Sequence, residues 1–223
     1  MWKVAIRLAA FALTILCWRW ARFGAFSTVW SVAVMWGGVG LVPLAALAGR
    51  RLLDRRPEWD SHGWVTTIVH YSEMILLGCA AITAVRIGRR YAIVAIPLRR
   101  DVSRIVLLAV GIFVTATVIN LAIQGLGAPF AVALSRKIAA GWLYSRTRNP
   151  MVLGCLVFAV VLGFWLQSLH VVLWAALWLS PAWLILVKVY EERELELRFG
   201  TPYLEYKRRT PFLWPRLRAA SPP

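Results

Sequence analysis

The chain has 223 residues, of which 60% are hydrophobic, with a mean hydropathy of +0.66 and a formal net charge of +16. Soluble globular domains contain about 45–50% apolar residues, so this composition excludes an ordinary water-soluble domain. The basic residues fall between apolar segments and form no single stripe with interleaved aromatic residues, which argues against nucleic acid as a partner. We therefore expect one membrane-embedded domain whose partner is the lipid bilayer.

Apolar segments recur along most of the chain. A membrane-spanning helix needs about 20 mainly apolar residues. The candidate segments are 4–18, 25–48, 65–85, 105–123, 151–168 and 170–189. They predict an all-α, polytopic membrane protein with about six transmembrane helices. No small-residue cleavage site precedes Trp18, so we interpret the first segment as a membrane helix and not as a removed signal peptide.

The second segment carries Gly37, Gly38 and Gly40 before Pro43. Small residues allow helices to approach closely, and proline kinks a helix. This pattern predicts a kink or a close helix contact.

The third segment contains a possible polar pair, His70 and Glu73, one helical turn apart. A carboxyl group inside a bilayer is costly and usually faces protein or a water-filled pocket. One interpretation is a structural pair near the membrane edge. The other is that the pair lines the route of a substrate or assists proton removal, and Asn120 in the fourth segment is a candidate for the same lining.

The three cysteines lie inside apolar segments and show no metal-ligand spacing, so they predict small buried side chains and no metal site.

Of the 26 Lys and Arg residues, 17 fall on the N-terminus, the 49–64 and 124–150 loops and the C-terminal tail, against eight on the opposite side. The positive-inside rule then places the 124–150 loop and the tail in the cytoplasm, whether the membrane is the bacterial inner membrane or the endoplasmic reticulum. The arginine-flanked YAIVAIPL segment in the 86–104 loop argues the other way and fits an interfacial or re-entrant piece.

The fifth and sixth segments are joined by only a few residues, so they must form an antiparallel helical hairpin. Asn149-Pro150 predicts a turn that starts the first of these helices, because proline is tolerated in a first helical turn. The hairpin returns the chain to the side it left. It therefore places Arg148 and Asn149 beside Glu191 and Glu192.

The C-terminal part combines an RNPM segment, a Glu-Glu pair, an F-G-x-x-Y-x-x-Y segment and a proline-bearing end. This order and spacing resembles the integral-membrane methyltransferases that use S-adenosylmethionine, among them isoprenylcysteine carboxyl methyltransferases and phospholipid N-methyltransferases. The glycines of Gly125-x-Gly127 before Pro129 resemble the glycine motif that precedes the core in the phospholipid enzymes. The matching positions are Arg148, Asn149, Pro150, Met151, Glu191, Glu192, Leu195, Phe199, Gly200, Tyr203, Tyr206, Pro211, Pro215 and Arg216.

The chain departs from the family pattern in three places. The family often has His where Asn149 stands and Tyr where Val152 stands. It usually has one residue between the glycine and the tyrosine that open the core, whereas two separate Gly141 from Tyr144.

The resemblance implies S-adenosylmethionine as cofactor, a lipophilic methyl acceptor, a pocket on the cytoplasmic side, and a division into N-terminal helices (1–104) and a methyltransferase core (105–223). It implies catalytic roles for Arg148, Asn149 and Glu192. A carboxylate pair can hold the amino group, the ribose hydroxyls or the sulfonium cation, tyrosine rings can face adenine or the cation, and glycines let backbone approach a ligand. The implied cofactor-binding residues are Gly125, Gly127, Tyr144, Pro150, Glu191, Glu192, Tyr203 and Tyr206.

Each feature also has a structural interpretation. Glu191, Glu192 and Glu194 with Arg198 fit a juxtamembrane helix held by Glu-to-Arg pairs at i,i+4. The tail tyrosines fit anchors at the membrane interface. Two other functions also stay open: an NADPH-dependent membrane reductase of the steroid-reductase type, and a non-catalytic scaffold whose tail docks a partner. The sequence identifies neither the methyl acceptor nor the oligomeric state.

Overall fold

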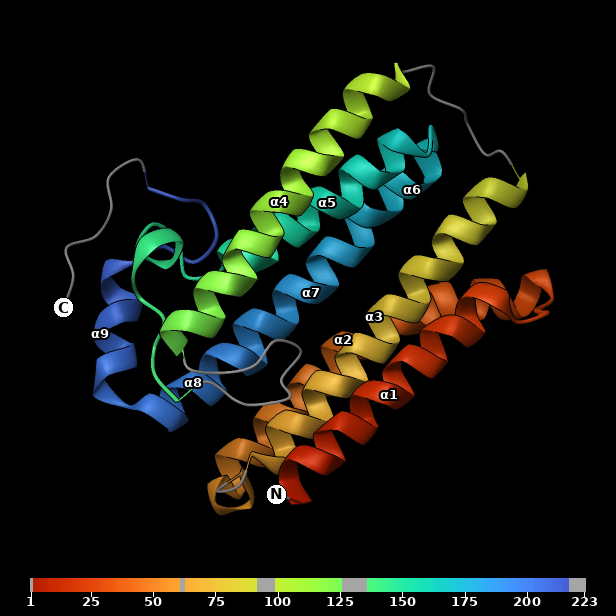
Figure 1. Ribbon diagram of the computed structural model, residues 1–223. Coiled ribbons are helices and arrows are strands. Elements are labelled where there is room, and N and C mark those ends of the chain that lie inside the picture. The colour runs from red at the N-terminus through yellow and green to blue at the C-terminus, as the bar shows by residue number, and fades with distance from the viewer. Residues whose placement is uncertain (1, 61–62, 92–98, 126–135, 217–223) are drawn as a thin grey trace.

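The computed structural model describes residues 2–60, 63–91, 99–125 and 136–216, and Figure 1 shows them as a bundle of long helices. All regular secondary structure in these ranges is helical, which confirms the all-α prediction. The YAIVAIPL segment, apart from Tyr91, and the second glycine of the predicted glycine motif lie outside the described residues.

Five described helices are long and apolar enough to cross a membrane. They are α1 (Trp2–Phe23), α2 (Thr28–Arg55), α3 (Trp64–Tyr91), α4 (Arg100–Gly125) and the continuous helical run Leu169–Phe199. The remaining expected span is the shorter apolar helix α5 (Pro150–Trp165), with 16 residues. At 1.5 Å per residue it is about 24 Å long, less than the hydrocarbon thickness of about 30 Å.

The first helix is longer than its apolar segment predicted, because it continues through Arg19 and Arg22 to Phe23. Arginine favours helices, and its long side chain can place the guanidinium in water while the stem covers apolar surface. The apolar segment therefore ends at Cys17-Trp18, although the helix continues beyond it.

The core lies between α2, α3 and the last long helical run, and α1 packs on α3 while α4 packs on α5 (Figure 1). At Gly38 a Cβ atom would stand 2.6 Å from the Cβ of Ala80, so α2 and α3 approach too closely there for any side chain. This confirms the close helix contact expected from the glycines. Helix α2 continues through Pro43 as one element.

The predicted helical hairpin is confirmed. Helix α5 begins at Pro150, as expected, and a short turn at Leu166–Ser168 leads into α6 (Leu169–Trp174). The Ser168 hydroxyl accepts a hydrogen bond from the backbone N–H of Val171 and caps the new helix.

The returning helix contains two π-helical segments. It runs from α6 through η4 (Ala175–Leu179), α7 (Ser180–Leu186), η5 (Val187–Glu191) and α8 (Glu192–Phe199). Each π segment uses i→i+5 hydrogen bonds and so accommodates an extra residue in its turn.

Gly200 ends this run with φ +60° and ψ −136°, a backbone conformation that side chains with a Cβ avoid. The chain then turns into α9 (Thr201–Arg209) and the final described residues 210–216. Helices α8 and α9, the short helix η3 (Trp142–Ser145) and the start of α5 gather at one end of the bundle (Figure 1), which we call the tail end.

Candidate functional site

An ion pair closes the tail end. Arg148, two residues before α5, donates from Nη2 to Oε1 of Glu192 at the start of α8. The two side chains are only 7% and 3% exposed. The proximity expected from the hairpin is therefore confirmed. Breaking a buried pair by removing one partner leaves an uncompensated charge, so this contact strongly constrains the fold.

The second oxygen of Glu192 is also occupied by cations. Lys188 Nζ lies 3.1 Å from it and Lys207 Nζ 2.8 Å, and Lys207 also contacts Glu196 at 2.8 Å. Burial by itself disfavours the Lys207 ammonium, but its hydrogen bonds with Glu192 and Glu196 outweigh this and raise the pKa of Lys207 above its ordinary value. Glu192 is thus fully neutralised by the protein itself.

The predicted catalytic pair Arg148-Asn149 also fastens the tail. Arg148 Nη1 donates to the carbonyl oxygens of Lys207 and Thr210, both at 2.7 Å. Asn149 Nδ2 donates to the carbonyl oxygen of Phe212 at 2.9 Å. The Nε of Arg148 is buried and has no hydrogen-bond partner among the described residues. One donor of this guanidinium is therefore unsatisfied within the described residues.

Three tyrosines form an aromatic wall next to these charges. The Tyr206 hydroxyl donates to the carbonyl oxygen of Tyr144 at 2.7 Å, and the Tyr203 and Tyr206 rings lie 6.1 Å apart. Burial raises the pKa of all three phenols, and nearby Glu191 and Glu192 add to the shift at Tyr203. Tyr203 and Tyr144 are buried, which differs from exposed interface anchors.

A second polar cluster joins α3 to η5. His70 Nδ1 lies 4.0 Å from a carboxylate oxygen of Glu73, and one donor atom from each of His70, Glu73 and Glu191 lies within 4.8 Å of the others. The Glu73 side chain is 6% exposed. Neither Glu73 nor Glu191 pairs with a lysine or arginine within the described ranges. Glu73 is buried and Glu191 is half-buried, and two carboxylates this close need a proton or another cation between them.

The structure thus brings the tentative substrate pair together with a predicted cofactor residue. Glu191 also lies near enough to Tyr144 and Tyr203 to contribute to raising the pKa of both phenols. The His70–Glu73–Glu191 cluster and the tyrosine wall therefore lie near one another.

The remaining predicted residues lie on α4 or at the start of α5. Gly125 is the buried last residue of α4, and its carbonyl oxygen accepts from the backbone N–H of Arg136 at 2.7 Å. Pro150 is fully buried in the first turn of α5. Asn120 is buried on α4, and its Oδ1 has no hydrogen-bond partner in the described part of the chain. The roles of these residues, and that of Gly127, stay predictions.

Several contacts at the tail end were not predicted. The contact of Lys188 with Glu192 could have been predicted from the sequence, because the two residues are four positions apart on one helix. The expected i,i+4 pair between Glu194 and Arg198 is also present. No sequence pattern predicts the contacts of Lys207, since its position depends on how the chain turns at Gly200 into α9. A cavity of about 390 Å³ opens beside this lysine and is lined by Glu196, Thr201, Leu204, Lys207 and Arg208.

Gly141 contacts α4 directly. Its backbone N–H donates to Oε1 of Gln124 at 2.9 Å, and a Cβ at Gly141 would stand 2.8 Å from Nε2 of the same side chain. A side chain at Gly141 would therefore require the amide end of Gln124 to shift, and the present contact draws the segment before η3 onto the end of α4.

The comparisons with known proteins give one curated relative. The chain is 36% identical over 79 residues to methanethiol S-methyltransferase 2 of Bradyrhizobium diazoefficiens. The match covers 34% of this chain and 27% of the relative, so it spans about a quarter of that protein's length. No family model matches the chain, and no solved structure matches it. The chain therefore shows distant, partial homology to a methyltransferase. Its own helices are long and apolar enough to span a membrane.

Proposed function

We propose that this protein is an integral-membrane methyltransferase that uses S-adenosylmethionine, with the tail end in the cytoplasm. The observation that carries the proposal is that the RNP segment, the Glu-Glu pair and the tyrosine-bearing tail close onto one another at that end. The distant homology to methanethiol S-methyltransferase 2 supports the same class of reaction.

The residues at the tail end suit the cofactor. S-Adenosylmethionine carries a sulfonium cation, an ammonium group and a carboxylate. Glu191 is a carboxylate without a lysine or arginine partner in the described ranges, and the buried Tyr144 and Tyr203 lie near it. Carboxylates and aromatic faces both favour a cation. The unpaired Nε of Arg148 suits a carboxylate.

This geometry changes the assignment within the Glu-Glu pair. Glu192 already pairs with Arg148, Lys188 and Lys207, so we assign it a positioning role. Glu191 has no such partners within the described structure and becomes the carboxylate that would hold the cofactor's positive groups.

When bound, S-adenosylmethionine supplies an electrophilic methyl group on its sulfonium sulfur. A carboxylate acceptor needs no base, whereas a thiol or an amine must also lose a proton as its bond to the methyl carbon forms. The His70–Glu73–Glu191 cluster offers basic groups for that proton. The burial of the site keeps water away and fixes the orientation of the reacting groups.

We propose that the acceptor is lipophilic and enters from the bilayer. The relative's name specifies a thiol, methanethiol, so thiols are the first class to test here. An isoprenylcysteine-like carboxylate and a phospholipid amine complete the panel, because neither is excluded by the groups in the site.

The test is calorimetric titration of the detergent-purified protein with S-adenosylhomocysteine, with NADPH as the control ligand. Saturable binding of the first and none of the second is expected. Binding of NADPH alone would replace the proposal with a reductase, and binding of neither by a demonstrably folded sample would contradict it.

A variant refines this test. Glu191→Gln should weaken binding of S-adenosylmethionine by about tenfold or more, because hydrogen bonds to charged groups contribute about 1.5–3 kcal/mol. It should weaken S-adenosylhomocysteine less, because that product lacks the sulfonium charge. Glu205→Gln, on the exposed side of α9, is the matched control and should change neither affinity.

A further inference from the structure

The end of the bundle opposite the tail end is strongly basic. It is formed by the last turns of α1 and α3, the first turns of α2 and α4, and the turn between α5 and α6, as the contact of Arg100 with Gln167 shows. Its charged residues in stretches 19–28 and 86–104 include a single acidic side chain, Asp101. The arginines of these stretches are Arg19, Arg22, Arg86, Arg89, Arg90, Arg99, Arg100 and Arg104. We call this region the arginine end.

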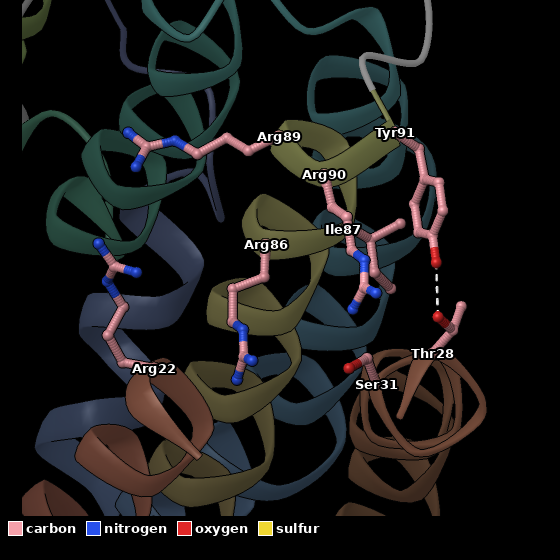
Figure 2. A pocket seen from close by; sticks show the side chains of 8 residues that line it. All are labelled: Arg22, Thr28, Ser31, Arg86, Ile87, Arg89, Arg90 and Tyr91. Atoms are coloured by element: carbon pink, nitrogen blue, oxygen red, sulfur yellow. Dashed lines mark hydrogen bonds between the residues drawn. The ribbon is translucent and has the colours of Figure 1, made fainter. Parts of the chain in front are cut away.

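A cavity of about 310 Å³ opens at the arginine end between α1, α2 and α3. Half of its lining residues are arginines and none is acidic (Figure 2). They are Arg22, Thr28, Ser31, Arg86, Ile87, Arg89, Arg90 and Tyr91. Residues 92–98, which follow directly, contain no charged side chain in the sequence, so they bring no counter-charge.

Part of this cavity is rigidly built. Arg86 donates to the carbonyl oxygens of Ala21 at 2.5 Å and Gly24 at 2.9 Å, which ties α3 to the end of α1. Across the gap the hydroxyl groups of Thr28 and Tyr91 share a hydrogen bond of 2.5 Å, drawn in Figure 2. The positive charge of Arg86 is thus held in a fixed place, where the neighbours that contact it are carbonyl oxygens and the Phe26 ring and no carboxylate pairs with it among the described residues.

The other three guanidinium groups are available to a ligand. Arg22, Arg89 and Arg90 are exposed and form no ion pair with any residue that the structure describes. Figure 2 shows Arg22 extending from α1 and the other two from the last turns of α3. Planar guanidinium groups that line one cavity can donate hydrogen bonds to the oxygens of a phosphate.

Large apolar side chains on the adjoining turns of α1 and α2 are exposed. Trp20 and Phe23 are 61% and 71% exposed, and Val29 and Trp30 are 77% and 67% exposed. Aromatic residues at the ends of membrane helices lie at the level of the lipid headgroups. A ligand in this cavity therefore has its charged part among arginines and hydrocarbon within reach.

We propose that this cavity binds the phosphate of an anionic phospholipid headgroup. Four of the eight arginines on the side to which the positive-inside rule assigns the fewest line this cavity, and the proposal explains their position. They serve as a binding site there and not as a topology signal. The proposal does not depend on the methyltransferase function.

The test is native mass spectrometry of the protein released from a zwitterionic detergent, titrated with dihexanoyl phosphatidylglycerol. Dihexanoyl phosphatidylcholine and inorganic phosphate are separate arms, the first to test the need for net negative charge and the second to identify a free phosphate as the ligand. The variant is Arg89→Gln/Arg90→Gln, which leaves the helix-tying Arg86 in place. The matched control is Arg51→Gln/Arg55→Gln, two exposed arginines at the opposite end of α2.

We expect saturable binding of one phosphatidylglycerol, weakened on the order of tenfold or more in the Arg89/Arg90 variant and unchanged in the control. Saturable binding of inorganic phosphate with the same loss would keep the site and assign it to a free phosphate. Absence of binding, equal binding of phosphatidylcholine, or an equal loss in the control would overturn the proposal. Thermal unfolding of the variant, expected to be unchanged, separates lost binding from lost folding.

Discussion

Arg148 and Glu192 are separated by 44 residues and meet in an ion pair that is almost closed to solvent. The pair joins the start of α5 to the start of α8, so it clamps the open end of the helical hairpin. Because Arg148 also holds two backbone carbonyls of the tail, one guanidinium organises both sides of the candidate site.

Replacing Glu192 with Gln should therefore destabilise the protein. The change leaves Arg148 buried without its countercharge, which typically costs about 3–5 kcal/mol. Thermal unfolding can be followed with a thiol-reactive dye, because Cys79 is buried in the folded protein. Glu205→Gln, a carboxylate lost from an exposed position, should leave the midpoint unchanged. Equal midpoints for the two variants would show that the pair does not clamp the fold.

Glu73→Gln should lower turnover with a thiol acceptor by about a hundredfold, the lower end of what general base catalysis contributes. Affinity for S-adenosylhomocysteine should be unchanged, because the proposed cofactor carboxylate is Glu191.

A pH profile tests the reason for this loss. A free thiol ionises with a pKa of about 8.5, so raising the pH above that value supplies thiolate without a base and should restore much of the rate of Glu73→Gln. Wild-type turnover should change far less over the same range. Unchanged turnover at neutral pH would remove Glu73 from the site, and a defect that persists at high pH would show that its role is not proton removal.

Gly200→Ala should destabilise the tail. No atom lies within 4 Å of the Cβ position, so steric contact is not the problem, but φ is +60° and the backbone would be strained by about 1–3 kcal/mol. Gly40→Ala is the matched control, since its Cβ position is also open while its backbone is helical. That control should be neutral or stabilising by up to about 1 kcal/mol. Limited proteolysis after α8 should accelerate only in the Gly200 variant.

Tyr206→Phe removes the hydrogen bond to the Tyr144 carbonyl and should cost about 1 kcal/mol. Its pH dependence follows from burial, which raises the pKa of Tyr206 and of its neighbours above the ordinary value of 10.0. Above pH 10 the unfolded chain loses phenolic protons that the folded protein retains, so stability falls as pH rises. The fall should be shallower in Tyr206→Phe. A parallel decline in both proteins, measured by unfolding between pH 9 and 11, would contradict this.

The sequence predicted the helices and the meeting of Arg148 with Glu192, because hydrophobic length and hairpin geometry are local properties. It did not predict that Lys207 neutralises Glu192, since this contact depends on the turn at Gly200 and on the direction of α9. It also did not place Glu191 against His70 and Glu73. That contact depends on how the last helix rotates against α3, which the apolar pattern leaves open because both helices are apolar on most faces.

The π-helical segment Val187–Glu191 has a consequence for the length of the chain. Glu191 faces α3 and Glu192 faces Arg148, so neighbouring residues serve separate charge clusters. Because the π turn accommodates one extra residue, deleting a single residue from this segment would restore α-helical hydrogen bonding and leave the direction of α8 unchanged. Glu192 and α9 would then keep their partners. The same deletion in the α-helical stretch Ser180–Leu186 would rotate everything after it by about 100° and separate Glu192 from Arg148.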